Sequence, residues 1–232
     1  MGLAGLTGRG VRVAIIDSGV NLGHPHIPAI AGGVEIMSQG EAPEYLDFLG
    51  HGTAVTAAIA EKAPEALLYA VKVFDRKLAT TADRILRAIG WALGQQIQIA
   101  NLSLGSRNPA HRESFSQIVA KAAAAGLVMV AARETSGIES LPGSLAGVIG
   151  VGLDWQCPRE SYRYRMNGSR PLFLASGYPR AIPGIPVEHN LSGISFAVAN
   201  MSGFVVRARQ ASPEASSTEL ETILMDGADS VT

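Results

Sequence analysis

Short, continuously apolar runs alternate with helix-like segments along the chain, and this alternation limits the possible folds more than any other feature. Short apolar runs of this kind, without polar alternation, are typical of strands in a parallel sheet that is buried on both faces. The sequence therefore predicts an α/β fold with three layers, a mostly parallel sheet flanked by helices. The predicted strands cover residues 11–16, 67–73, 97–104, 127–132 and 145–151. Residues 154–192 are rich in Pro, Gly, Arg and Tyr, and we expect long loops there.

Capping residues mark the ends of several predicted helices. Thr80 and Thr81 can cap the helix that follows them, and Gly126 can end the helix before it. Ser216 and Glu219 have the spacing of a capping box. The predicted helices cover residues 51–61, the segment that carries Ile85 to Leu93, 115–125, 195–209 and 217–229.

The composition fits one domain over residues 1–232. The apolar fraction of 47% and the net charge of −1, from 19 basic and 20 acidic residues, exclude a disordered chain. Proteins that bind nucleic acid usually carry a basic excess, which is missing here, so we expect no nucleic-acid partner. No apolar run approaches the ~18–20 residues that span a bilayer, so we expect no membrane partner.

The single cysteine bears on where the protein works. Cys157 cannot form a disulfide within the chain, which excludes a secreted scaffold held by disulfides. The first nine residues lack a basic segment followed by an apolar one, so no signal peptide is visible. We therefore expect a cytoplasmic protein.

Three polar residues stand at the ends of predicted elements. Asp17 follows the first strand, His51 opens a helix, and Ser195 precedes a run of helix-forming residues. Each has an ordinary interpretation when taken alone: a turn aspartate, a surface histidine and a serine N-cap. Together they supply a carboxylate, an imidazole and a hydroxyl, the groups that nucleophilic acyl chemistry requires.

Three sequence blocks around these residues resemble the subtilisin-like serine proteases, or subtilases. The blocks are Val13–Val20 with its Asp-Ser-Gly, Gly50–Val55 with its Gly-His-Gly-Thr, and Gly193–Ala199 with its Gly-Ile-Ser. They occur in the order aspartate, histidine, serine that is known for subtilisin. The resemblance covers about residues 9–229 and implies a subtilisin-like fold and the hydrolysis of peptide bonds. No segment before Arg9 resembles the family's pro-domain, so we expect a small member without one.

The resemblance also implies a role for each residue. Ser195 would attack the peptide carbonyl, and His51 would take its proton and return it to the leaving amine. Asp17 would hold the imidazole tautomer and stabilise the imidazolium. The backbone N–H of Ser195 would be one donor to the oxyanion.

The family's oxyanion asparagine is not evident in this sequence. Without a gap, Thr135 takes its place; with a gap of one residue, Glu134 does. The Thr135 hydroxyl can donate a hydrogen bond but is carried on a shorter side chain, and an ionised Glu134 would repel the oxyanion. Loss of such a donor slows this family's reaction by roughly 10²–10³-fold, so the activity is expected to be weak.

The substrate-binding stretches match the family in part. Ser103, Leu104 and Gly105 correspond to the segment that pairs with an extended substrate beside the specificity pocket. Ala132 and Arg133 fall in the opposite wall, where Arg133 and the glutamate after it replace small residues. The pocket then either accepts an unusual residue, charged or small, or is blocked until a partner rearranges it.

No cofactor or metal ion is expected. His26 stands where many members carry a calcium-binding aspartate, and imidazole is a poor ligand for calcium. His24 and His26 are more simply explained as loop histidines than as a metal pair.

Two functions from different classes remain open. The first is an active serine endopeptidase of narrow specificity, for example one that cleaves the leader from a ribosomally made precursor peptide. The second is a binding or scaffold protein that keeps the fold but has lost useful catalysis. A nucleotide-binding protein is discounted, because the glycines of residues 147–152 lack the spacing of the dinucleotide fingerprint.

Overall fold

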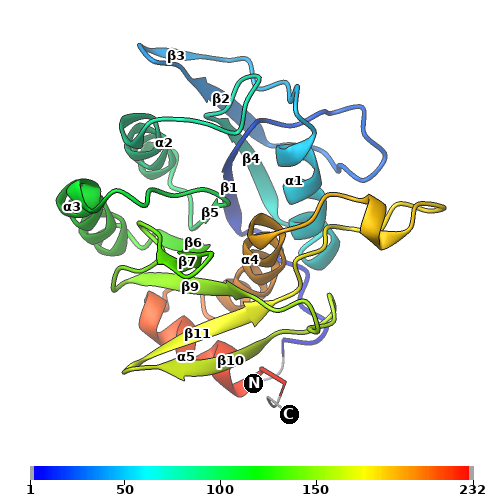
Figure 1. Ribbon diagram of the computed structural model, residues 1–232, viewed down its shortest axis with the longest axis vertical. Helices are drawn as coiled ribbons and strands as arrows, with labels where there is room; N and C mark the ends of the chain where they lie inside the picture. Colours follow the sequence, from blue (N-terminus) through cyan, green and yellow to red (C-terminus); the bar gives the residue numbers. More distant parts are fainter. Residues whose placement is uncertain (1–2, 230–232) are drawn as a thin grey trace.

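The computed structural model describes residues 3–229, and a nine-stranded sheet runs through the molecule (Figure 1). The strand order is β10-β11-β9-β6-β5-β1-β4-β2-β3, and all neighbouring pairs are parallel except β10–β11 and β2–β3 at the two edges. The strands are β1 (Arg12–Asp17), β2 (Gly32–Ile36), β3 (Glu41–Ala42), β4 (Leu67–Lys72), β5 (Ile99–Leu102), β6 (Val128–Ala132), β9 (Val148–Leu153), β10 (Arg163–Asn167) and β11 (Arg170–Ala175). A separate two-stranded hairpin consists of β7 (Glu134–Thr135) and β8 (Ile138–Glu139).

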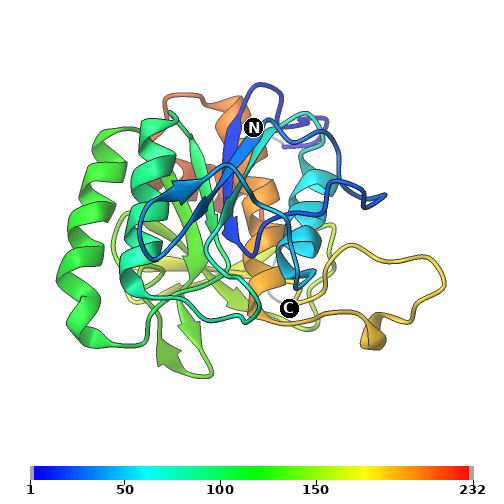
Figure 2. The ribbon, with the colours of Figure 1, turned by 90° about the horizontal axis from the view of Figure 1, so that it is seen from above.

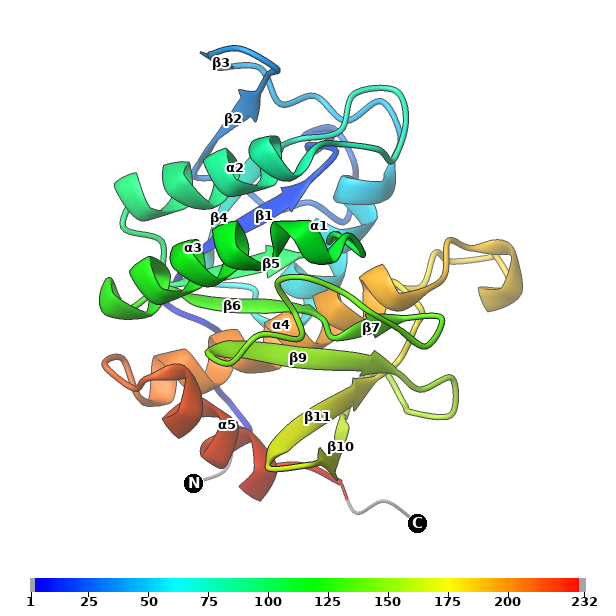
Figure 3. The ribbon, with the colours of Figure 1, turned by 60° about the vertical axis from the view of Figure 1, so that its left-hand side comes forward.

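Helices cover both faces of the sheet, as Figures 2 and 3 show. Helices α2 and α3 lie on one face and α1, α4 and α5 on the other. The helices are α1 (His51–Lys62), α2 (Ala82–Gly94), α3 (Arg112–Ala124), α4 (Ile194–Ala211) and α5 (Ser217–Asp226), with short 3₁₀ turns η1 (Pro109–His111) and η2 (Val187–His189). No helix within residues 3–229 is long and apolar enough to cross a membrane. The predicted three-layer α/β fold is confirmed.

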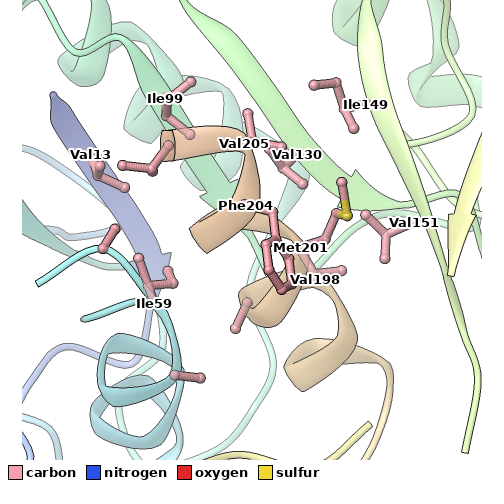
Figure 4. Packing of buried hydrophobic residues seen from close by; sticks show 14 of the residues in the cluster. Val13, Ile59, Ile99, Val130, Ile149, Val151, Val198, Met201, Phe204 and Val205 are labelled. Carbon is pink, nitrogen blue, oxygen red and sulfur yellow. The ribbon is translucent and has the colours of Figure 1, made fainter. Parts of the chain in front are cut away.

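The sheet separates two apolar cores. Helix α4 packs across the middle strands in the larger core, where Val198, Met201 and Val205 meet side chains from β6 and β9 (Figure 4). The second core joins the other face of the sheet to α2 and α3. Because both faces are buried, the central strands are apolar without alternation, and four of the five residues of β6 are Val or Ala.

The local signals in the sequence place most element ends correctly. Thr81 caps α2 by accepting a hydrogen bond from the Arg84 N–H, and Gly126 follows α3 with φ of 76°. The predicted capping box of Ser216 and Glu219 is present at the start of α5.

The stretch 154–192 was predicted as loops, and this is wrong for part of it. Strands β10 and β11 form an antiparallel hairpin that turns at Gly168 and extends the sheet at one edge. Tyr162, just before β10, is buried and donates a hydrogen bond to the carbonyl of Leu224 in α5. Arg163 and Arg165 in β10 hide the strand pattern, since an edge strand needs only one apolar face.

The carboxyl ends of parallel strands lie at the same edge of the sheet. Strand β1 lies beside β5, and β5 lies beside β6, so Asp17 and the segments that follow Leu102 and Ala132 come together. This is the edge where open α/β sheets place their functional groups.

Candidate active site

Asp17 ends β1 and is fully buried. Its Oδ1 atom accepts a hydrogen bond from the Ser18 N–H (2.7 Å) and lies 2.7 Å from His51 Nδ1. Burial of a carboxylate is tolerated when its oxygen atoms accept strong hydrogen bonds, as Oδ1 does here. Asp17 therefore fills both predicted roles, because the same side chain stabilises the turn after β1 and pairs with a histidine.

His51 is the first residue of α1, and the start of the helix lies close to the end of β1 because the next residue is Gly52. A Cβ atom on Gly52 would lie 2.3 Å from the Gly19 carbonyl oxygen. Such a distance is possible only without a side chain, so Gly52 allows the imidazole to reach Asp17. The ring also packs against Phe196, with centroids 5.4 Å apart.

The environment of His51 alters its basicity. Burial lowers the pKa, but the hydrogen bond that His51 donates to Asp17 and the negative charges of Asp17 and Asp47 outweigh it. The pKa of His51 therefore lies above its ordinary value of 6.5. A base with such a pKa accepts a proton readily near neutral pH.

Asp47 organises the start of α1, a role that the sequence analysis missed. Its two carboxylate oxygens accept hydrogen bonds from the N–H groups of Leu49, Gly50 and Thr53 and from the hydroxyls of Ser18 and Thr53. An anion at a helix N-terminus stabilises the free N–H groups there. The sequence signal for this role was the position of Asp47, three residues before Gly50, which directly precedes His51.

Ser195 is the second residue of α4. Gly193 is the N-cap, with φ of 138° and no side chain to cap the helix, so the interpretation of Ser195 as an N-cap is wrong. The Ser195 hydroxyl donates to the carbonyl oxygen of Ser103 (3.2 Å). Its side chain lines the same cavity as His51.

A short chain of hydrogen bonds fixes the segment next to Ser195, and it too was missed. Ser202 in α4 donates to Asn101 Oδ1 (3.0 Å), and Asn101 Nδ2 donates to the Ser103 hydroxyl (2.9 Å). That hydroxyl donates to the Ser195 carbonyl oxygen (3.2 Å). Because Asn101 and Ser202 are fully buried, this chain couples β5 rigidly to the first turn of α4.

The cavity beside these residues has a volume of about 380 Å³. The predicted substrate-binding residues Ser103, Leu104, Gly105 and Ala132 line it together with His51 and Ser195. Its remaining lining residues are Phe74, Leu78, Ala79, Thr80, Arg107, Thr135, Ser140, Ile194 and Val198.

The two candidates for the oxyanion position point in different directions. Thr135 is half-buried and lines the cavity, whereas Glu134 is exposed and does not. Their strand β7 turns back at Ser136 and Gly137, which have φ of 56° and 74°, and successive residues of a strand face opposite sides. Of the two, Thr135 is the residue that reaches the site.

Arg133 also lies outside the cavity lining. Its Nη1 atom is buried and has no hydrogen-bond partner among residues 3–229, and its charge acts on Arg170 in β11 and Glu221 in α5. The expected charged wall of the specificity pocket is therefore not formed by the side chains of Arg133 and Glu134.

The other polar candidates lie apart from this cavity. His24 and His26 contact each other, with ring centroids 5.1 Å apart, beside a second cavity of about 270 Å³. Within residues 3–229, no three His, Cys, Asp or Glu side chains are grouped to hold a metal ion. Cys157 is buried, and burial raises the pKa of its thiol, which disfavours a nucleophilic thiolate.

Comparison with known proteins identifies the family of this chain. Residues 8–232 match the Subtilase family, Peptidase S8. The chain is 32% identical over 248 residues to Subtilisin Savinase of Lederbergia lenta, covering 98% of this chain and 86% of that protein. It is also 32% identical to an alkaline protease of Alkalihalobacillus alcalophilus, over 98% of this chain but only 61% of the relative's length.

Solved structures share the fold at lower identity. A crystal structure of a lanthipeptide protease superposes with a TM-score of 0.75 at 19% identity and covers 96% of this chain and 81% of that chain. A cold-adapted subtilisin-like serine proteinase has a TM-score of 0.73 at 21% identity, covering 96% of this chain and 84% of that chain. The chain therefore belongs to the Subtilase family, and its relatives indicate a serine endopeptidase.

Proposed function

We propose that the protein hydrolyses peptide bonds through a triad of Asp17, His51 and Ser195. The observation that carries the proposal is the buried contact of 2.7 Å between His51 Nδ1 and Asp17 Oδ1, next to a cavity that His51 and Ser195 both line. An imidazole held by a carboxylate on one nitrogen presents the other nitrogen to a nucleophile.

Each group has one task in the reaction. The Ser195 oxygen attacks the carbonyl carbon of the substrate while His51 Nε2 takes the hydroxyl proton. Asp17 accepts the Nδ1–H hydrogen bond throughout and stabilises the imidazolium. His51 then gives the proton to the leaving amine, and an acyl-enzyme on Ser195 remains. Water, deprotonated by the same imidazole, releases the acyl group and restores the serine.

The tetrahedral intermediate needs hydrogen-bond donors for its oxygen anion. Ser195 lies in the first turn of α4, where backbone N–H groups have no partner within the helix and the helix dipole favours negative charge. Thr135 supplies the second donor through its hydroxyl. A threonine reaches less far than an asparagine, so the proposal includes a slow chemical step.

A narrow substrate range completes the proposal, with removal of a segment from a precursor peptide as the task. Two observations support it: the similarity in fold to a protein described as a lanthipeptide protease, and the tight packing around Gly105 described below.

A second function is favoured by two features of the site. The Ser195 hydroxyl donates to the Ser103 carbonyl oxygen in the resting structure, and the donor proposed for the oxyanion is a threonine that lines the cavity. These features suit a binding protein that retains the fold with impaired catalysis.

Turnover of a peptide library by purified protein separates the two. The library carries every residue type before the scissile bond, and the products are identified by mass. The peptidase proposal expects cleavage that Ser195→Ala abolishes and that Ser192→Ala, an exposed serine three residues away, preserves. Equal cleavage by wild type and Ser195→Ala contradicts the triad. A folded wild type that binds peptides and cleaves none supports the binding protein.

A further inference from the structure

Two segments form the walls of a slot beside Ser195. Residues 103–105 continue from β5, and residues 133–135 continue from β6, which pairs with β5 so that Leu102 lies opposite Ala131. Gly105 on one side and Thr135 on the other both line the cavity. A substrate side chain that enters beside Ser195 has to pass between these walls.

A third segment, Ser140–Leu141, ties the two walls together. The Ser140 N–H donates to the carbonyl of Arg133 (3.0 Å) on one wall. On the other, Leu141 exchanges two backbone hydrogen bonds with Ser106, each 2.8 Å long. Moving this segment outward breaks these hydrogen bonds, so it forms a fixed base rather than an adjustable one.

The base packs directly against both walls. A Cβ atom placed on Gly105 would lie 2.4 Å from Ser140 Oγ and 2.6 Å from the Leu141 carbonyl oxygen, so not even a methyl group fits between them. Behind the opposite wall, a Cβ atom on Gly143 would lie 2.0 Å from the Ala132 carbonyl oxygen. Ser140 itself is 5% exposed and lines the cavity.

We infer that Ser140 closes the floor of this slot and restricts the substrate residue on the amino side of the scissile bond to Gly, Ala or Ser. A larger side chain overlaps Ser140 or forces residues 140–141 away from both walls. Interiors at this density do not absorb added methylene groups without displacement. The inference rests on the proposed peptidase function and names its substrate class.

Peptides that differ at one position test the inference. Pools with that residue fixed as Gly, Ala, Ser, Val, Leu, Phe, Glu or Arg, and with neighbouring positions randomised, are digested and the cleavage sites are read by mass. The wild type is expected to favour Gly, Ala and Ser over Val, Leu and Phe by roughly tenfold or more in kcat/KM. Equal or better cleavage after a large residue overturns the inference.

Variants of the floor give the sharper result. Ser140→Gly deepens the slot and is expected to raise kcat/KM for Val and Leu relative to Ala by about tenfold, because each added methylene is worth 10-fold or more in a fitted pocket. Ser140→Val raises the floor of the slot. This variant is expected to keep cleavage after Gly and to lose cleavage after Ala and Ser. An unchanged preference in the variants that fold overturns the inference.

A matched control shows that the change is local. Ser38→Gly makes the same substitution at an exposed loop serine outside the cavity lining. It is expected to retain the preference for Gly, Ala and Ser, and a shift in this variant contradicts the assignment to Ser140.

A fluorophosphonate probe separates failure of this inference from failure of the proposed function, because it reacts with an activated serine without a peptide side chain. Labelling at Ser195 together with cleavage after large residues overturns the inference and leaves the peptidase in place. A folded protein that the probe does not label overturns both.

Discussion

His51 Nδ1 lies 2.7 Å from Asp17 Oδ1, and both side chains are buried. The carboxylate therefore fixes which imidazole nitrogen carries the proton. Asp17→Asn can keep the contact but donates to Nδ1 and favours the wrong tautomer. We expect kcat to fall by about 10⁴-fold, the scale for losing this aspartate in related enzymes. Steady-state kinetics measures it; a loss below tenfold in a folded variant contradicts the role of Asp17.

The pH dependence follows from the raised pKa of His51. The neutral imidazole accepts the serine proton, so kcat/KM is lost as the pH falls through that pKa, and the midpoint is expected above 6.5. Because the charge of Asp47 raises this pKa, Asp47→Asn is expected to move the midpoint to lower pH. Asp83→Asn, an exposed site on α2, is expected to leave it in place. A midpoint that stays fixed or rises in Asp47→Asn would mean that the charge of Asp47 does not raise the pKa of His51.

Thr135 is expected to act as an oxyanion donor. Thr135→Val keeps the shape and removes the hydroxyl, so kcat should fall by up to roughly 10²-fold while KM changes little. Thr135→Asn supplies a longer donor and should raise kcat above wild type. Glu134→Gln, on the exposed neighbour, is the control and should be neutral. If Glu134→Gln alters kcat and Thr135→Val does not, the donor has been assigned to the wrong residue.

Lys62 gives a prediction about stability. Its side chain is buried between α1 and α4, where Nζ donates to Asn200 Oδ1 at 2.7 Å. Burial lowers the pKa of Lys62 from 10.5 to about 8; the charge of Arg159 lowers it too, and that of Glu61 opposes the change. Between these two pH values the unfolded chain binds more protons than the folded one, so the lysine's contribution to stability rises with pH.

Replacing the lysine removes this dependence. We compare the free energy of unfolding of Lys62→Met with that of the wild type at each pH. The difference is expected to favour the variant by about 3 kcal/mol more at pH 7 than at pH 11. Denaturant unfolding at the two pH values measures the difference, and Lys121→Met, on the exposed face of α3, should show none. A difference of the opposite sign would mean that the folded protein binds the proton more tightly than the unfolded chain does.

The sequence predicted those features that local patterns encode. Apolar strands and capping residues identified the layered sheet, and the blocks around Asp17, His51 and Ser195 identified residues that the fold brings to one edge. Strand β10 was missed because Arg163 and Arg165 conceal a strand that needs one apolar face.

What the sequence could not predict depends on contacts between distant segments. The hydrogen bond from the Ser18 hydroxyl to Asp47, the backbone pairing of Leu141 with Ser106, and the outward direction of Glu134 all follow from how separate loops meet. A side chain's direction in a two-residue strand such as β7 has no periodic signal that reveals it.

Covalent labelling shows whether the Ser195 hydroxyl is an activated nucleophile. The purified protein is treated with a fluorophosphonate, and the site of the adduct is mapped by mass spectrometry in wild type, Ser195→Ala and His51→Ala. We predict one adduct, on Ser195, that is absent in Ser195→Ala and strongly reduced in His51→Ala. No adduct on a folded wild type, or an adduct that persists in Ser195→Ala, would mean that Ser195 is not an activated nucleophile.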